Sequence, residues 1–307
     1  MADVQLDLVR ESRFRESPFA VRAGRTGSLA WQALKKPTTA GGFIIILLLI
    51  GMAVFAPLLA EPNTPDAFQM PRDFTLIDAP PGTAGHLLGT TSDGGDVLYG
   101  VVWGARSSVR LSITVVIVAV LIGVIVGSLA AVIGGLVDEF LMRIVDVFMS
   151  VPELIFPLAI AAVLGPSFSN IIIALAAVLW AKYARIIRAE ILRVRQSSYV
   201  EAASAIGDSK FRIYRRDILP NSITPITVQA TLEMGHVVLL GATLSFIGLA
   251  EAGLAEWGVL VSEGQRGIAN GRWWAATFPG LMIFLWALAF NLVGDGLRDA
   301  LDPRTED

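Results

Sequence analysis

The chain has 307 residues, of which 54% are hydrophobic and only 17% are charged, whereas soluble domains average roughly 25% charged residues. Its long charge-free apolar runs exceed what a soluble core buries, so the composition predicts a protein embedded in a lipid membrane. The net charge of −3 gives no basic surface of the kind that binds nucleic acid, and the absence of cysteine excludes disulfides and thiolate metal sites.

Charge-free runs mark the expected membrane spans. We expect six helices, near residues 40–60, 111–134, 141–164, 169–189, 221–249 and 275–295. Each meets the roughly 20 residues that cross a bilayer core of about 30 Å. The turn Gly165-Pro166-Ser167 divides the longest apolar run into two helices, because proline interrupts a helix. The sequence therefore predicts an all-α membrane protein with six transmembrane helices.

Lysine and arginine are unevenly distributed between the connecting segments. Residues 1–39 carry seven of them and residues 182–216 carry nine, whereas 61–110 carries three and 250–274 carries two. Because cytoplasmic loops are enriched in Lys and Arg, we expect a multi-pass protein of the cell membrane (inner or plasma membrane) with both termini in the cytoplasm. A cleaved signal peptide is the alternative for the first span, but the apolar run is too long and begins too late for one.

The expected division of the chain follows from these spans. It comprises a cytoplasmic tail at 1–39, a first transmembrane helix at 40–60, an external loop at 61–110, a transmembrane domain at 111–298 and a second cytoplasmic tail at 299–307. Within the external loop, apolar residues from Val97 to Ala105 recur at helical spacing behind Asp96. This pattern favours a short helix lying flat on the membrane with Trp103 at headgroup level. The alternative is that it is the start of the second span.

Residues 199–220 are too polar for lipid and too regular for a loose linker. A first helical face of Val200, Ala203 and Ile206 is followed by Gly207, where the chain can turn, and then by a second apolar stripe among basic residues. A small-residue face and an apolar stripe rimmed by charge suit a segment that docks in a groove of a cytoplasmic partner. The alternative is a basic amphipathic loop resting on anionic lipid.

This segment resembles the EAA loop of importer-type ABC permeases, in which Glu-Ala-Ala is followed by Gly and then by Leu-Pro. The matching positions are Glu201, Ala202, Ala203, Gly207, Leu219 and Pro220. The motifs His86-Leu-Leu-Gly-Thr90, Leu244-Ser-Phe-Ile-Gly-Leu249 and the run from Asn291 to Arg304 look like the C-type permease subunit of dipeptide, oligopeptide and nickel ABC importers. The chain departs from that family at Thr91, Gly95 and Asp217, where Asp, Arg and His are usual.

The resemblance implies a type I ABC importer permease fold with a cytoplasmic coupling helix within 199–220. It implies a non-enzymatic subunit that translocates di- or oligopeptides delivered by an extracytoplasmic binding protein, with nickel, short oligosaccharides or glutathione-like peptides as alternative cargoes. The implied partners are a B-type permease, which completes a heterodimer, and two cytoplasmic ATPase subunits. The six matching positions of the EAA loop are implied to couple the permease to the ATPases.

Absent motifs agree with this interpretation. The chain has no Gly-x-x-x-x-Gly-Lys-Ser/Thr loop, so ATP must be bound by partner subunits, and we expect no cofactor in this chain. Metalloprotease and serine-hydrolase motifs are missing as well, so we expect neither a catalytic residue nor a resident metal. A secondary transporter is the alternative from another class, but it would usually show paired repeats, which this sequence lacks.

Ionisable residues within the third span stand out because a charge in lipid is costly. Arg143 and Asp146 are three residues apart, and we expect them to pair as a structural latch. Pro152 should kink the helix and present Glu153 to a cavity.

The fifth span carries Glu233 and His236, three residues apart near the bilayer midplane. One interpretation places them, with Glu153, along a translocation path. The other has them hydrogen-bonded to each other and fixing helix packing. At the start of the last span, Trp273 and Trp274 are expected to be interfacial anchors.

Overall fold

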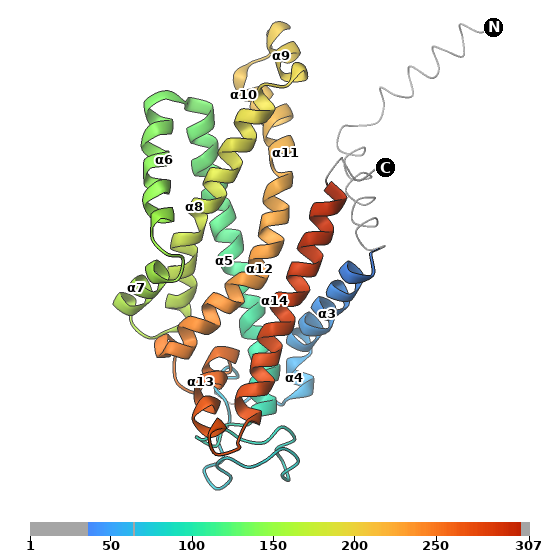
Figure 1. Cartoon of the computed structure of the whole chain (residues 1–307), viewed down its shortest axis with the longest axis vertical. Helices are drawn as coiled ribbons and strands as arrows, with labels where there is room; N and C mark the ends of the chain where they lie inside the picture. The colour runs from blue at the N-terminus through green and yellow to red at the C-terminus, as the bar shows by residue number, and fades with distance from the viewer. Residues whose placement is uncertain (1–35, 64, 302–307) are drawn as a thin grey trace, which may run out of the picture.

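The computed structural model describes residues 36–63 and 65–301, so most of the expected tails at 1–39 and 299–307 lies outside the described residues. Figure 1 shows long helices running side by side in an elongated bundle. Five described helices are long and apolar enough to cross a membrane, and a sharply bent pair brings the number to six when it is counted as one span. The prediction of an all-α membrane protein with six spans is confirmed.

The spans agree with the charge-free runs, with shifted ends. The first is α3 (Pro37–Val54), followed by the single turn α4 (Ala56–Leu59), and the second is α5 (Val97–Ile133). The fourth is α8 (Phe168–Arg195), and the fifth is α12 (Thr224–Leu244), which continues into the π-helical turn η2 (Ser245–Leu249). The sixth is α14 (Trp274–Leu301). An ion pair of 2.9 Å between Lys36 and Asp299 joins the start of the first span to the end of the last.

The third span is broken rather than straight. It consists of α6 (Gly135–Ser150) and α7 (Ile155–Leu164), which meet at 88° around Pro152, so the predicted kink is confirmed. The predicted pair of Arg143 with Asp146 is wrong, because Asp146 forms its ion pair with Arg185 of α8. A guanidinium from the helix packed alongside reaches this carboxylate, and a partner on the same helix is not needed.

The short helix expected behind Asp96 is the first part of α5. Asp96 does cap the helix, since its Oδ1 accepts a hydrogen bond from the Tyr99 amide (2.7 Å), but the helix continues without a break to Ile133. Trp103 is buried, stacks on Tyr99 and donates from Nε1 to the Ala60 carbonyl (3.2 Å). The prediction of a flat interfacial helix with Trp103 among headgroups is therefore wrong, because protein and not lipid covers this face.

Helices α5 and α8 pack closely at the centre of the bundle. A Cβ built on Gly127 of α5 would lie 2.2 Å from the Ala184 carbonyl oxygen of α8. Only a residue without a side chain permits this approach of two backbones. Buried residues of both helices, including Leu111, Leu175 and Ile187, belong to one hydrophobic cluster.

A folded cap covers the end of the bundle opposite α9 (Figure 1). It consists of the loop at 65–96 and the helix α13 (Trp257–Ile268) with the residues just before it. The β-bridge Gln69–Leu254 and hydrogen bonds such as Ala255 N to Phe68 O (2.7 Å) join the two segments. Trp274 is buried beneath the loop and donates from Nε1 to the Thr90 carbonyl (3.0 Å). The prediction that Trp274 is an interfacial anchor is wrong, whereas Trp273 is half exposed.

Candidate functional site

A polar cluster lies between α8, α12 and the break between α6 and α7. We define it by five residues: Glu153 in the break, Lys182 on α8, and Gln229, Glu233 and His236 on α12. The Lys182 ammonium and the Gln229 amide both donate to Glu233 Oε2, at 3.0 and 2.9 Å. His236 Nε2 lies 3.1 Å from Glu153 Oε2. Ligand atoms of Glu153, Glu233 and His236 lie within 4.8 Å of one another.

The three residues proposed for a translocation path are therefore brought together by two parts of the chain, the α6–α7 break and α12. The packing interpretation assumed a hydrogen bond between Glu233 and His236. In the structure each is paired instead with a residue from another element, Glu233 with Lys182 and His236 with Glu153. Lys182 and Gln229 were not expected at this site from the sequence. Gln229 lies one helical turn before Glu233, which was a usable signal, whereas nothing in the sequence placed Lys182 beside either carboxylate.

Burial divides the cluster into a closed side and an open side. The Glu233 side chain is only 1% exposed, and its Oε1 has no hydrogen-bond partner among the described residues. A buried carboxylate is costly unless it is paired, so Lys182 and Gln229 are what makes its burial possible. Glu153 and His236 are 46% and 38% exposed. A cavity of about 440 Å³ opens beside Glu153 and Lys182, between the α6–α7 break and α8.

The segment at 198–222 forms the tip of the bundle (Figure 1). It contains α9 (Ser198–Ala205), α10 (Lys210–Ile213), the π-helical turn η1 (Tyr214–Ile218) and α11 (Leu219–Ser222). The expected helix, glycine bend and second helix are confirmed. Gly207 has φ +87°, and a Cβ there would meet nothing within 4 Å. Its constraint is therefore conformational and does not arise from crowding within this chain.

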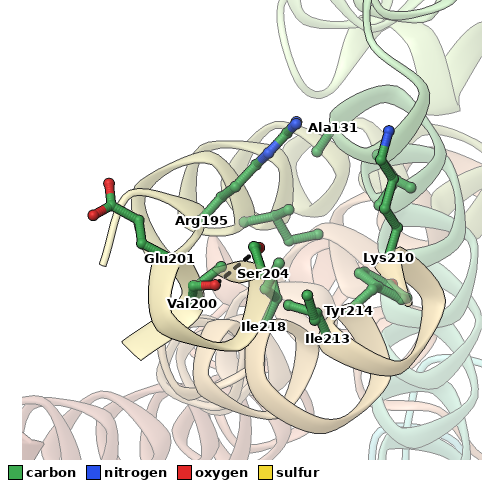
Figure 2. Close-up of a pocket in the computed structure, with 11 residues that line it drawn as sticks. Ala131, Arg195, Val200, Glu201, Ser204, Lys210, Ile213, Tyr214 and Ile218 are labelled. Atoms are coloured by element: carbon green, nitrogen blue, oxygen red, sulfur yellow. Dashed lines mark hydrogen bonds between the residues drawn. The ribbon is translucent and has the colours of Figure 1, made fainter. Parts of the chain in front are cut away.

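The tip presents apolar side chains away from the bundle. Ile206 is 82% exposed and Phe211 is 72% exposed, whereas Val200, Ile213 and Ile218 are buried. Figure 2 shows Ile213, Tyr214 and Ile218 gathered together while Glu201 points outward from the cavity of about 400 Å³ that they line. Among the other positions of the EAA-like motif, Ala202 is exposed, whereas Ala203, Leu219 and Pro220 are half-buried. Leu219 and Pro220 lie in α11, which connects the tip to α12.

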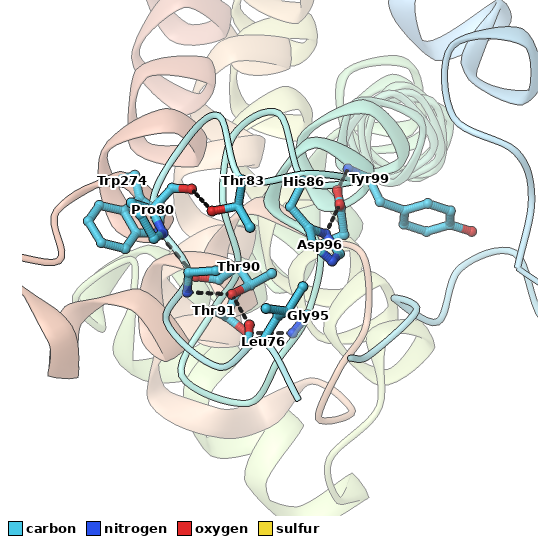
Figure 3. A network of polar contacts seen from close by, with 11 residues as sticks. Leu76, Pro80, Thr83, His86, Thr90, Thr91, Gly95, Asp96, Tyr99 and Trp274 are labelled. Carbon is cyan, nitrogen blue, oxygen red and sulfur yellow. Dashed lines mark hydrogen bonds and ion pairs between the residues drawn. The ribbon is translucent and has the colours of Figure 1, made fainter. Parts of the chain in front are cut away.

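Titratable side chains organise the cap at the other end. His86 Nδ1 lies 2.6 Å from Asp96 Oδ2, which ties the loop to the start of α5 (Figure 3). Burial raises the pKa of Glu256, whose Oε2 accepts from the Val259 amide at the start of α13. Burial also raises the pKa of Glu263, against the opposing effect of Arg72, which lies 3.5 Å away.

The unusual residues Thr91 and Gly95 contact each other within this loop. The Thr91 hydroxyl accepts a hydrogen bond from the Gly95 amide (3.0 Å), and a Cβ on Gly95 would lie 3.1 Å from that hydroxyl. A large side chain at residue 95 would therefore require the Thr91 side chain to move. Thr91 and Gly95, the positions at which the sequence departs from the pattern it resembles, therefore constrain each other.

Long spanning helices, a polar cluster near the middle of α12, a protruding apolar tip and a cap at the opposite end define a multi-pass membrane protein of the permease class. The family described as "Binding-protein-dependent transport system inner membrane component" matches residues 119–307. The chain belongs to this family.

Individual relatives extend the match over most of the chain. The probable D,D-dipeptide transport system permease protein DdpC of Escherichia coli (strain K12) is 41% identical, covering 90% of this chain and 91% of the relative. The dipeptide transport system permease protein DppC of Bacillus subtilis (strain 168) is 38% identical, covering 90% and 85%. In a solved structure of the MetNI methionine ABC transporter, a chain with 20% identity matches with a TM-score of 0.53, covering 66% of this chain and 97% of that one. This likeness identifies the fold as that of an ABC importer permease.

Proposed function

We propose that this chain is the permease subunit of an ATP-driven importer that moves di- or oligopeptides delivered by an extracytoplasmic binding protein. The observation that carries the proposal is the match, along 90% of the chain, to relatives named for D,D-dipeptide and dipeptide transport. The proposed complex contains a B-type permease and two cytoplasmic ATPase subunits. Both termini lie in the cytoplasm, as the basic segments at 1–39 and 182–216 indicate.

The tip at 198–222 is proposed to dock on an ATPase subunit. Its exposed Ile206 and Phe211 would insert into an apolar groove of that partner, with the outward-pointing Glu201 beside them. Gly207 holds the bend between the two short helices in its positive-φ conformation. Closure of the two ATPases would then be transmitted through the supporting residues Leu219 and Pro220 into α12.

The polar cluster is proposed to line the translocation path. Glu153, Glu233 and His236 offer two carboxylates and an imidazole near the middle of the bundle, and ionisable groups at this depth typically face a water-filled cavity. The same donors suit a divalent cation, so nickel is the second candidate cargo.

Reconstitution tests the function directly. The chain is co-expressed with its partner permease and ATPases, placed in liposomes and supplied with the binding protein. We expect ATP-dependent uptake of a radiolabelled dipeptide and none of ⁶³Ni²⁺. Uptake by the permease chain alone, without ATP, would instead establish a secondary transporter.

A substitution pair tests the docking surface in the same preparation. Ile206→Asp should prevent co-purification of the ATPase subunit and abolish uptake, because it places a charge in an apolar contact. The control Phe74→Asp changes another well-exposed apolar residue (70% exposed, against 82% for Ile206) in the cap and should leave the ATPase bound. An Ile206→Asp complex that assembles and transports normally would contradict the docking role.

A further inference from the structure

We propose that the cavity between the α6–α7 break and α8 is a binding subsite for a short peptide in its zwitterionic form. Glu153 accepts the peptide's ammonium group, and Lys182 donates to its terminal carboxylate. This inference rests on the proposed function and adds to it the mode of substrate recognition within the membrane.

The composition of the cavity wall supports a zwitterion with apolar side chains. The cavity of about 440 Å³ is large enough for a small ligand. Ten residues line it, of which two are charged, and they carry opposite charges: Glu153 and Lys182. The remaining wall is largely apolar, with Phe148, Met149 and Pro152 on one side.

The two charged groups line one cavity beside one polar cluster, so a single short ligand can contact both. Lys182 bonds to Glu233, which in turn shares with Glu153 a cluster whose ligand atoms lie within 4.8 Å. The charged ends of a dipeptide are separated by two residues, which is at most about 7 Å of extended chain. Both lining groups are reachable from the cavity, since Glu153 is 46% exposed and Lys182 is 39% exposed.

Both groups also keep bonding capacity beyond their contacts within the protein. An ammonium group has three donors, and Lys182 uses one on Glu233 Oε2. A carboxylate can accept several hydrogen bonds, and among the described residues Glu153 is bonded at Oε2 by His236. The buried Glu233 and the half-buried Gln229 hold Lys182 in place through their hydrogen bonds, so a peptide can bind without rearranging the cluster.

The charge balance favours a zwitterion over a metal ion. A divalent cation held by Glu153, Glu233 and His236 would lie beside the Lys182 ammonium, which is only 3.0 Å from Glu233. Like charges at such distances repel each other. A zwitterion places its own negative group next to Lys182 and its positive group next to Glu153.

A cysteine introduced into this Cys-free chain reports occupancy of the cavity. Met149→Cys lies in the wall and is 43% exposed, whereas Ile173→Cys on α8 is 54% exposed and lies outside the cavity-lining set. The full complex in nanodiscs is treated with maleimide alone, with L-alanyl-L-phenylalanine, with its N-acetylated amide, or with Ni²⁺. We expect the free dipeptide to slow labelling of residue 149 several-fold, the blocked peptide and Ni²⁺ to have no effect, and residue 173 to be labelled equally throughout.

Glu153→Gln keeps the side chain's shape and a bond to His236 but removes the charge, so it should abolish the protection and lower dipeptide uptake while the complex still assembles. Three results would each overturn the subsite. The blocked peptide could protect residue 149 from labelling as well as the free dipeptide does, Ni²⁺ could protect it in place of the dipeptide, or Glu153→Gln could leave the protection by the dipeptide unchanged. Dipeptide uptake by the wild-type complex is measured first, as the test of the proposed function. If the wild-type complex takes up the dipeptide and residue 149 is not protected, the subsite alone is wrong; if the wild-type complex takes up none, the proposed function and the subsite both fail.

Discussion

Glu233 is 1% exposed, and two donors, Lys182 and Gln229, converge on one of its oxygens. Removing the charge of either Lys182 or Glu233 alone would leave the other charge without its partner. Removing one partner of a fully buried pair costs about 3–5 kcal/mol, whereas replacing both partners is often tolerated. Here Lys182 is 39% exposed, so water partly screens the pair and the expected cost is smaller.

We predict that Lys182→Met lowers the free energy of unfolding by about 1–3 kcal/mol, because it leaves the Glu233 carboxylate buried without its counter-charge. The double variant Lys182→Met/Glu233→Gln should be more stable than the single variant. Thermal unfolding of the purified permease in detergent measures both. Additive losses would mean that the two residues are not energetically coupled.

Gly207 has φ +87° and open space around its Cα. Gly207→Val should insert and fold in the membrane, but it should distort the tip at a cost of the order of 1 kcal/mol or more and reduce ATP-driven transport. Gly207→Asn is the matched control, because asparagine tolerates the left-handed region better than other residues with a side chain. Normal transport by the valine variant would show that the bend is not needed for coupling.

At the scale of elements, the contact of α5 with α8 depends on glycine. Gly127→Ala would place a Cβ 2.2 Å from the Ala184 carbonyl oxygen, so the two helices must separate. We expect a loss of about 1–3 kcal/mol, as in other overpacked cores, measured as a lower unfolding temperature. Gly51→Ala on α3 meets nothing within 4 Å and should be neutral or stabilising, since alanine favours helix. Equal effects of the two substitutions would contradict close packing of α5 against α8.

The cap should respond to pH through Glu256 and Glu263, whose pKa values are raised chiefly by burial. A carboxyl group whose pKa is raised in the folded state binds its proton more tightly when the protein is folded. Its contribution to the stability of the cap is therefore fully present below the unfolded-state pKa near 4.5. That contribution is lost as the pH rises through the higher pKa of the folded state. Hydrogen exchange of the α13 amides, corrected for the intrinsic rate, should therefore show less protection at higher pH. Glu256→Gln should flatten this dependence; an unchanged profile would exclude Glu256 as a source.

Spans and turns were predictable because each depends on a local signal. Continuous apolar runs place the helices, Pro152 breaks the third span, and Gly207 ends the first helix of the tip. Ion pairs between elements were not predictable from the sequence. Asp146 and His236 each have an ionisable residue three positions away on the same helix, but their partners in the structure, Arg185 and Glu153, come from other elements. The continuity of α5 was only the alternative expectation, because the sequence of the cap gives no local signal that it will cover Trp103.

At the scale of the whole molecule, the cap and the tip are expected on opposite sides of the membrane. A membrane-impermeant maleimide applied to intact cells should label Phe74→Cys in the cap and fail to label Ala205→Cys in the tip, because both side chains are exposed and differ in their side of the membrane. Met70 is only 4% exposed and would be a poor reporter. Labelling of residue 205 from outside, with none at residue 74, would reverse the topology.

The 37 residues of α5 form one uninterrupted rod of about 55 Å, nearly twice the thickness of the hydrocarbon core. Its first turn is tied to the cap through Asp96 and His86, and its last turns, at Ala131 and Val132, line the cavity beneath the tip. In the complex proposed above, a binding protein on one side and ATPases on the other would therefore act on the two ends of the same helix. Because α5 is one continuous helix, a tilt of one end moves the other end at the same time, unless the helix bends.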